Sequence, residues 1–170
     1  LSVLALSALM LLVVNKIIQH GCFMDGGLYL SVSKNYARGL GEFWHPHFSK
    51  TQSNYFTEQP PLYFFVMQCF YRAFGMGFVA ERIFALFCTG FTLLMIHLCW
   101  KLVTGNARGA SFPIFMFVIT PVIFWAYSNF VEEVLMTGFV LLSAYASLRA
   151  VKENEKTWLW LTLAAIASVL

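Results

Sequence analysis

A polar segment at residues 20–61 carries most of the side chains in this sequence that could do chemistry. It holds Asp25, Glu42 and Glu58, together with Tyr29 and three of the four histidines. Long apolar runs flank it on both sides. A loop of about 40 residues without a repeat is usually either functional or disordered, and its many aromatic residues argue against disorder. We therefore expect this segment to be folded and to carry a functional site.

Asp25 is the strongest candidate for a catalytic group. Gly26 and Gly27 follow it and would leave the backbone beside its carboxylate open to close approach. Residues 25–38 have a helical pattern, on which Tyr29 lies at i+4 and shares a face with Asp25. The carboxylate could take a proton from a substrate as a general base, or it could cap the helix. Tyr29 could orient that carboxylate or be an interfacial aromatic residue.

Other charged side chains lie close to the ends of apolar runs. Glu132 and Glu133 could add an acidic group, or with Asp25 hold Mg²⁺ or Mn²⁺, or they could simply be solvated. Arg82 could hold a phosphate through two parallel hydrogen bonds, pair with a neighbouring glutamate, or extend to the membrane surface. Glu58 could belong to the site or be a structural acid before a helix.

The composition is that of a polytopic membrane protein. Hydrophobic residues make up 59% of the chain and charged residues 11%, against about 25% charged residues in ordinary soluble domains. The formal charge of +3 does not indicate a nucleic-acid partner. The four cysteines have neither metal-ligand spacing nor the pattern of a disulfide framework.

Five apolar stretches predict membrane-spanning helices within a single transmembrane domain. Because the chain starts with Leu1 and ends inside an apolar run, we expect it to be the N-terminal part of a longer protein. Pro121 should kink the third span. The predicted spans cover residues 1–18, 83–103, 112–128, 134–150 and 158–170.

The first loop, residues 19–82, is expected to contain a second helix that does not span the membrane. Pro60 and Pro61 are well placed to begin this helix. Its apolar part, residues 62–74, is shorter than the about 20 residues that a membrane span needs. We therefore predict a helix in the plane of the interface or a re-entrant helix, and irregular structure over residues 42–57.

The basic residues predict the topology. If residues 62–74 do not span, the loops after the second and fourth spans share one side, which the positive-inside rule makes cytoplasmic. The first loop and the acidic pair Glu132 and Glu133 then share the opposite side. If residues 62–74 spanned, the first loop would instead join the basic side. We favour the arrangement in which residues 62–74 do not span the membrane. The cytoplasmic side then carries Lys101, Arg108, Arg149, Lys152 and Lys156.

Several short motifs follow one another along the chain: Asp25-Gly-Gly-Leu-Tyr29, KNYARGLGEFWHPHF, Tyr55-Phe-x-Glu58-Gln-Pro60-Pro61-Leu62, Phe74-Gly75 and Ala80-Glu-Arg82. Their order and spacing resemble the start of membrane glycosyltransferases with the GT-C fold. The resemblance is to the branch of protein mannosyltransferases and lipid A aminoarabinose transferases, and Glu133-Val134-Leu135 occupies the place of a short acidic motif of that branch.

The resemblance implies an all-α, polytopic transmembrane helix bundle whose long extracytoplasmic first loop carries interfacial helices. It implies transfer of a sugar from a polyprenyl-phosphate donor to a lipid, glycan or protein acceptor, outside the plasma (inner) membrane. Site residues implied in this way are catalytic Asp25, Glu133 and Glu132, and substrate-binding Tyr29, Glu58 and Arg82. We predict no metal ligands and leave a divalent cation, Mg²⁺ or Mn²⁺, as an open possibility.

The sequence departs from this family pattern at several positions. Gln59 stands where relatives have a lysine, so a cationic contact to the donor phosphate is absent there. Gly26 stands where relatives usually have an acid, Glu133 replaces an aspartate, and Ile83-Phe84 replaces Leu-Pro. The alternatives to an enzyme are a transporter segment, which would place polar residues in mid-span as His97 does, and a non-catalytic membrane scaffold.

Overall fold

The computed structural model describes residues 1–49, 51, 54–152 and 157–169, and most of these are helical. The first helix runs without interruption through α1 (Ser2–Ala8), η1 (Leu9–Val14) and α2 (Asn15–Ile17). The remaining helices of the bundle are α5 (Phe78–Thr104), η2 (Ala107–Ala110), α6 (Ser111–Ile119), α7 (Pro121–Asn129), α8 (Glu133–Lys152) and α9 (Thr157–Val169).

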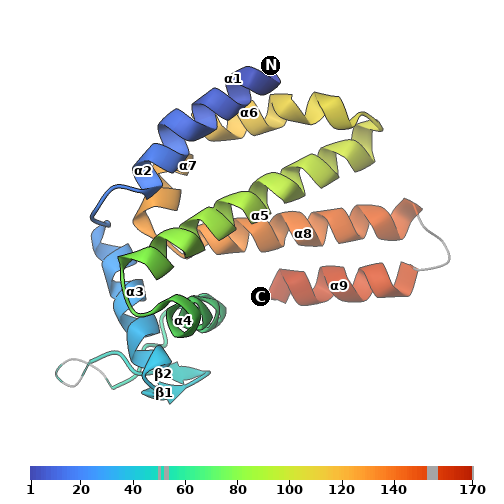
Figure 1. The fold of residues 1–170 in the computed structure, drawn as a ribbon. Helices are drawn as coiled ribbons and strands as arrows, with labels where there is room; N and C mark the ends of the chain where they lie inside the picture. The colour runs from blue at the N-terminus through green and yellow to red at the C-terminus, as the bar shows by residue number, and fades with distance from the viewer. Residues whose placement is uncertain (50, 52–53, 153–156, 170) are drawn as a thin grey trace.

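These helices lie side by side in a curved row (Figure 1). The first helix packs against α6, α5 packs against α8, and α8 packs against α9. By length and composition α5 and α8 can each cross a membrane, and η2–α6 with α7 makes a third span if the bent pair counts as one. That pair is bent by 72° where Pro121 begins α7, which confirms the predicted kink. The prediction of an all-α membrane helix bundle is also confirmed.

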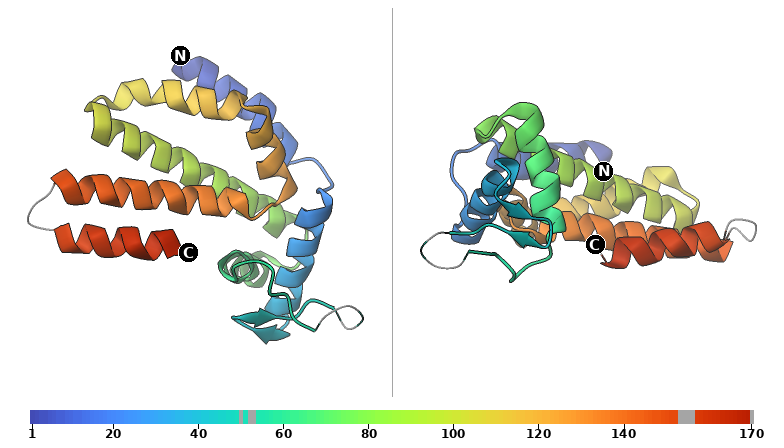
Figure 2. Two further views of the ribbon diagram at one scale, coloured as in Figure 1. Left: turned by 180° about the vertical axis from the view of Figure 1, so that it is seen from behind. Right: turned by 90° about the horizontal axis from the view of Figure 1, so that it is seen from below.

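The first loop folds into a small unit beyond one end of the row (Figures 1 and 2). It contains α3 (Met24–Ala37) and α4 (Leu62–Phe74), which confirms both predicted helices. The prediction of irregular structure over residues 42–57 is wrong in part. A two-stranded hairpin of β1 (Gly41–Glu42) and β2 (His45–Pro46) lies there, with its turn at residues 43 and 44. The glycine at position 41, with a φ of +85°, lets the strands approach closely, because a Cβ there would lie 2.4 Å from the backbone nitrogen of His47. Residues 50, 52 and 53 of that range lie outside the described residues.

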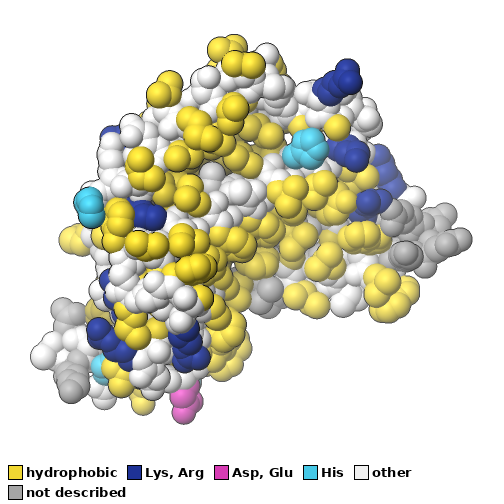
Figure 3. Space-filling view, in the orientation of Figure 1, with side chains coloured by type: hydrophobic (Ala, Val, Ile, Leu, Met, Phe, Trp, Pro, Cys, Tyr) yellow, Lys and Arg dark blue, Asp and Glu magenta, His cyan; other side chains and the backbone are white. Residues whose placement is uncertain are grey.

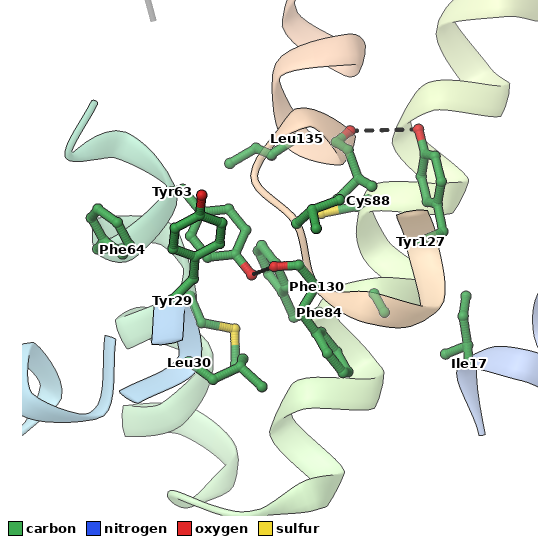
Figure 4. Packing of buried hydrophobic residues seen from close by; sticks show 14 of the residues in the cluster. Ile17, Tyr29, Leu30, Tyr63, Phe64, Phe84, Cys88, Tyr127, Phe130 and Leu135 are labelled. Atoms are coloured by element: carbon green, nitrogen blue, oxygen red, sulfur yellow. Dashed lines mark hydrogen bonds between the residues drawn. The ribbon is translucent and has the colours of Figure 1, made fainter. Parts of the chain in front are cut away.

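An aromatic core joins this unit to the bundle (Figure 4). Tyr63 on α4 is buried and donates a hydrogen bond to the carbonyl of Phe130, after α7, at 2.7 Å. Phe64 and Phe84 are fully buried around it. Aromatic side chains contribute most of the buried area at such a junction, so the two halves are held together where α4, α5 and the turn after α7 meet.

An ion pair between half-buried Lys34 and buried Glu81 ties α3, α4 and α5 together. The Lys34 ammonium lies 2.8 Å from Glu81, whose carboxylate also accepts a hydrogen bond from the Tyr71 hydroxyl at 3.0 Å. The interpretation that Arg82 pairs with Glu81 is therefore wrong. Glu81 uses Lys34 from a distant segment, which the sequence spacing did not indicate.

Lys and Arg side chains lie at both ends of the molecule (Figure 3). Lys101, Arg149 and Lys152 line one hollow at the end where α5 and α8 terminate. The first-loop unit lies at the other end, together with the turn between α7 and α8. Lys156 falls outside the described residues.

Candidate active site

Asp25 lies in the first turn of α3 and is exposed. Phe23 is the N-cap residue, no side chain caps the helix, and Asp25 makes no side-chain hydrogen bond or ion pair with any described residue. The interpretation of Asp25 as a cap is therefore wrong. The Asp25 side chain is therefore open to a substrate.

The start of α3 packs against the turn after α7. The backbone N–H of Phe23 donates to the side-chain oxygen of Asn129 at 2.7 Å. Gly26 packs so closely there that an added Cβ would lie 1.7 Å from the carbonyl oxygen of Asn129. The expectation that Gly26 is open to a substrate is wrong, because the protein itself fills that space. The acid that relatives usually carry at this position has no room here.

Tyr29 lies one turn beyond Asp25 and points into the aromatic core (Figure 4). It is buried, with its ring 5.9 Å from that of Tyr63. Burial raises the pKa of Tyr29, and the negative charges of Glu132, Glu133 and Asp25 raise it further, whereas a hydrogen bond with Gln59 lowers it. The structure therefore brings the three predicted acids within electrostatic range of one hydroxyl.

Glu132 and Glu133 differ sharply in exposure. Glu133 begins α8 and is exposed, whereas Glu132 in the preceding turn is only 5% exposed. One carboxylate oxygen of Glu132 has no hydrogen-bond partner among the described residues. Burial, and then the charge of Glu133, raise the pKa of Glu132 to about 7. This carboxyl group therefore exchanges its proton near neutral pH.

Glu132 faces the residues that open α4. It lines a hollow of about 10 Å³ together with Pro60, Leu62 and Tyr63, which is room for about one water molecule. Glu58 lies just before this point and is exposed. Gln59 contacts Tyr29, so the position where relatives carry a lysine faces the candidate site, and the residue there is neutral.

Arg82 lies behind the site rather than in it. It is 6% exposed and its guanidinium lies between the rings of Phe78 and Phe130, at 4.4 and 4.6 Å. It donates to the carbonyls of Gly21 at 3.1 Å and Ser128 at 3.5 Å. These bonds hold the segment before α3 against the turn after α7. Its role as a donor-phosphate ligand stays a prediction.

The sequence did not indicate the role of Asn129, which accepts the hydrogen bond that holds the start of α3. It also did not indicate that Glu132 is buried and Glu133 exposed. The only sequence signal for Asn129 was a polar residue at the end of an apolar run. Across the described residues, no three His, Cys, Asp or Glu side chains converge to hold a metal ion. What the arrangement offers is one exposed carboxylate, one buried carboxyl group with a pKa of about 7, and a buried phenol that is influenced by the charges of both.

The candidate acids lie at one end of a membrane helix bundle, on the folded first loop and in the turn before α8. This arrangement fits the class of GT-C-like membrane glycosyltransferases. The chain belongs to the dolichyl-phosphate-mannose-protein mannosyltransferase family, whose model matches residues 58–169, more than half of its length. It is therefore a glycosyltransferase and an integral membrane protein. The match includes Arg82, Glu132 and Glu133, whereas Asp25 precedes it. No curated protein and no solved structure matches the chain.

Proposed function

We propose that this protein moves a sugar from a polyprenyl-phosphate carrier to a lipid, glycan or protein acceptor on the extracytoplasmic face of the plasma (inner) membrane. The observation that carries the proposal is the exposed Asp25 carboxylate, which has no partner among the described residues and lies one helical turn from Tyr29. Family membership supplies the reaction type, and this carboxylate is the group most available to act in it.

Asp25 is proposed as the general base. Its carboxylate takes the proton from the acceptor hydroxyl, and the acceptor oxygen attacks the anomeric carbon of the donor sugar. The bond between that carbon and the phosphate oxygen breaks, and polyprenyl phosphate leaves with the electron pair. A positioned base of this kind contributes about 10²- to 10⁴-fold to the rate.

Glu132, Glu133 and Tyr29 are proposed to shape the acceptor subsite. Glu133 is exposed and can accept a hydrogen bond from an acceptor hydroxyl. Glu132 can accept a hydrogen bond when charged and donate one when protonated, and its pKa of about 7 makes both forms available. Tyr29 is influenced by the charges of all three acids and is held by its packing against Tyr63 in the aromatic core.

Glu58 is proposed to serve the donor side, since it is exposed beside Gln59, which contacts Tyr29. Arg82 is proposed as a positioning residue, because it donates to the carbonyls of Gly21 and Ser128. It keeps the start of α3, and with it Asp25, in register with the turn that carries Glu132.

The test compares Asp25→Asn with the wild type in the full-length protein in nanodiscs. Transfer is measured from a panel of radiolabelled polyprenyl-phosphate sugars. We expect Asp25→Asn to lower the transfer rate at least about 100-fold with an unchanged unfolding temperature. Glu42→Gln is the matched control, because Glu42 is an exposed acid of the same loop outside the site, and it should transfer at the wild-type rate.

Two outcomes would contradict the proposal at different points. If Asp25→Asn transferred at the wild-type rate, the protein would still be a transferase, and the base would have to be Glu132 or Glu133. If the wild-type protein transferred sugar from no polyprenyl-phosphate donor, the donor class itself would be wrong.

A further inference from the structure

The turn of the hairpin between β1 and β2 consists of two aromatic residues. Glu42 pairs with His45, so Phe43 and Trp44 form a two-residue turn. Turns of this length usually carry Asn, Asp or Gly, because these residues tolerate the positive φ that the favoured turn types need. Neither Phe43 nor Trp44 has a positive φ, and the Trp44 side chain is 70% exposed. The geometry of the turn therefore does not explain why two large aromatic side chains lie there.

The exposed apolar surface of this turn continues onto α4. The centre of the Phe43 ring lies 5.0 Å from that of Trp44 and 5.6 Å from that of Phe65 on α4, and Phe65 is exposed. Cys69 lies one helical turn beyond Phe65 and is also exposed. Adjoining exposed apolar side chains of this kind mark a surface that contacts a partner or a membrane. We define the aromatic patch by these residues: Phe43, Trp44, Phe65 and Cys69.

The outer face of α4 differs from that of a helix that faces water. A helix at an aqueous surface buries its apolar face and carries charged and polar residues outside. In α4 the polar groups of Gln68 and Tyr71 are buried, and Arg72 in the last turn is the only charged residue of the helix. The exposed residues of α4 are Phe65, Cys69, Arg72, Ala73 and Phe74. This outer face therefore suits contact with lipid.

The surface of α4 continues the surface that α5 presents to the membrane. The rings of Phe70 on α4 and Phe87 on α5 lie 5.4 Å apart, and Phe87 is exposed on a helix that can cross a membrane. In Figure 1 α4 is seen nearly end-on, whereas α5 and α8 run across the picture, so α4 lies crosswise to the spans at one end of the bundle. Hydrophobic side chains continue from the bundle onto the first-loop unit (Figure 3). This continuity with the spans favours lipid as the partner of the aromatic patch.

We propose that the aromatic patch lies in the interface of the lipid bilayer and that the hairpin turn anchors the first loop to the membrane there. Tryptophan favours this region, because its ring is apolar and its N–H group can reach a polar headgroup. The hairpin is fixed to α3, because the Asn35 side chain donates to the carbonyls of His47 at 3.3 Å and Phe48 at 3.1 Å. The hairpin, α3 and α4 therefore rest on the membrane together. This contact extends the interface beyond α4, and it does not depend on the proposed function.

The test places a nitroxide spin label at Trp44→Cys in a full-length variant without other cysteines, in phosphatidylcholine nanodiscs. Electron paramagnetic resonance measures collisions of the label with oxygen, which concentrates in the bilayer, and with a water-soluble nickel complex. The matched control is Thr51→Cys, because Thr51 is exposed in the same loop and lies in a polar stretch outside the aromatic patch. We expect the ratio of oxygen to nickel collisions to be higher at position 44 than at position 51.

Two results would overturn the proposal, and they differ in what they reveal. A label at position 44 that collides with the nickel complex as often as the label at position 51 would place the aromatic patch in water. A label that neither reagent reaches would show that another part of the protein covers the patch. Should Trp44→Cys fail to fold, the label is attached to the native Cys69 in a variant that keeps only this cysteine. The same preference for oxygen is expected there, and either of the two contrary results would again overturn the proposal.

Discussion

At the scale of single residues, two adjacent glutamates have opposite environments. The turn that carries them follows Phe130, which adopts a left-handed conformation with φ of 58° at the end of α7. Such a conformation is uncommon outside glycine, and no residue type in the turn signals it. The sequence therefore predicted an acidic pair at this place and could not predict that Glu132 is buried and Glu133 exposed.

Burial of Glu132 predicts that the protein becomes less stable as pH rises. Its pKa is about 7 in the folded protein against an ordinary value of 4.5, so the folded state holds the proton more tightly than the unfolded state. The free energy of unfolding should therefore fall between pH 4.5 and about 7, by about 3 kcal/mol at most. Glu132→Gln should remove this decline, which thermal unfolding of the full-length protein in detergent at pH 5 and pH 8 measures.

Glu133→Gln is the matched control for that measurement, because it removes the exposed acid next to the buried one. It should reduce the decline only slightly, since the charge of Glu133 is the smaller cause of the raised pKa of Glu132. A decline of the same size in Glu132→Gln and in the wild type would show that another group is responsible.

At the scale of elements, most helices could be predicted and their docking could not. The proline pair before α4 and the apolar patterns of α5 and α8 indicated those helices from local chemistry. The seating of α3 depends on Asn129, and the pairing of Lys34 with Glu81 depends on a distant segment. Both contacts are tertiary, so no local pattern encodes them.

The docking of α3 gives a matched pair of glycine substitutions. Gly26→Ala would place a Cβ 1.7 Å from a backbone oxygen, whereas the nearest atom to a Cβ at Gly27 is the Cys22 sulfur at 3.4 Å. We expect Gly26→Ala to destabilise the protein by about 1–3 kcal/mol through overpacking and to reduce sugar transfer, because Asp25 moves with the helix. Gly27→Ala should be neutral or slightly stabilising, since alanine favours a helix.

Thermal unfolding and sugar transfer of both variants test this prediction in the full-length protein. Equal unfolding temperatures for the two variants would mean that the close approach between α3 and the turn after α7 is not maintained in the membrane.

At the scale of the whole molecule, the first loop and a group of cations lie at opposite ends. Lys101, Arg149 and Lys152 lie at one end, and the first loop lies at the other. The positive-inside rule predicts that the end with these three cations faces the cytoplasm. This orientation stays a prediction, because the packing of the helices does not determine which side of a membrane an end faces.

Cysteine labelling tests this orientation. Cys22 is exposed beside α3, whereas Cys88 is buried. In intact cells, a membrane-impermeant maleimide should label a variant of the full-length protein that keeps only Cys22, and should not label one that keeps only Cys88. Arg108→Cys, placed in a variant without other cysteines, should be labelled only after the cells are permeabilised. Labelling of Arg108→Cys in intact cells would reverse the orientation.

The hydrogen bond between Phe23 and Asn129 joins residues 106 positions apart in the chain, and this separation has a consequence during synthesis. A ribosome adds about 5–20 residues per second, so Asn129 is made roughly 5 to 20 s after Phe23. For that interval the start of α3 lacks the residue that accepts the Phe23 hydrogen bond. A nascent chain that stops before this point can already pair Lys34 with Glu81, but the helix start beside Asp25 has no turn to pack against. The site is therefore complete only when the turn after α7 leaves the ribosome.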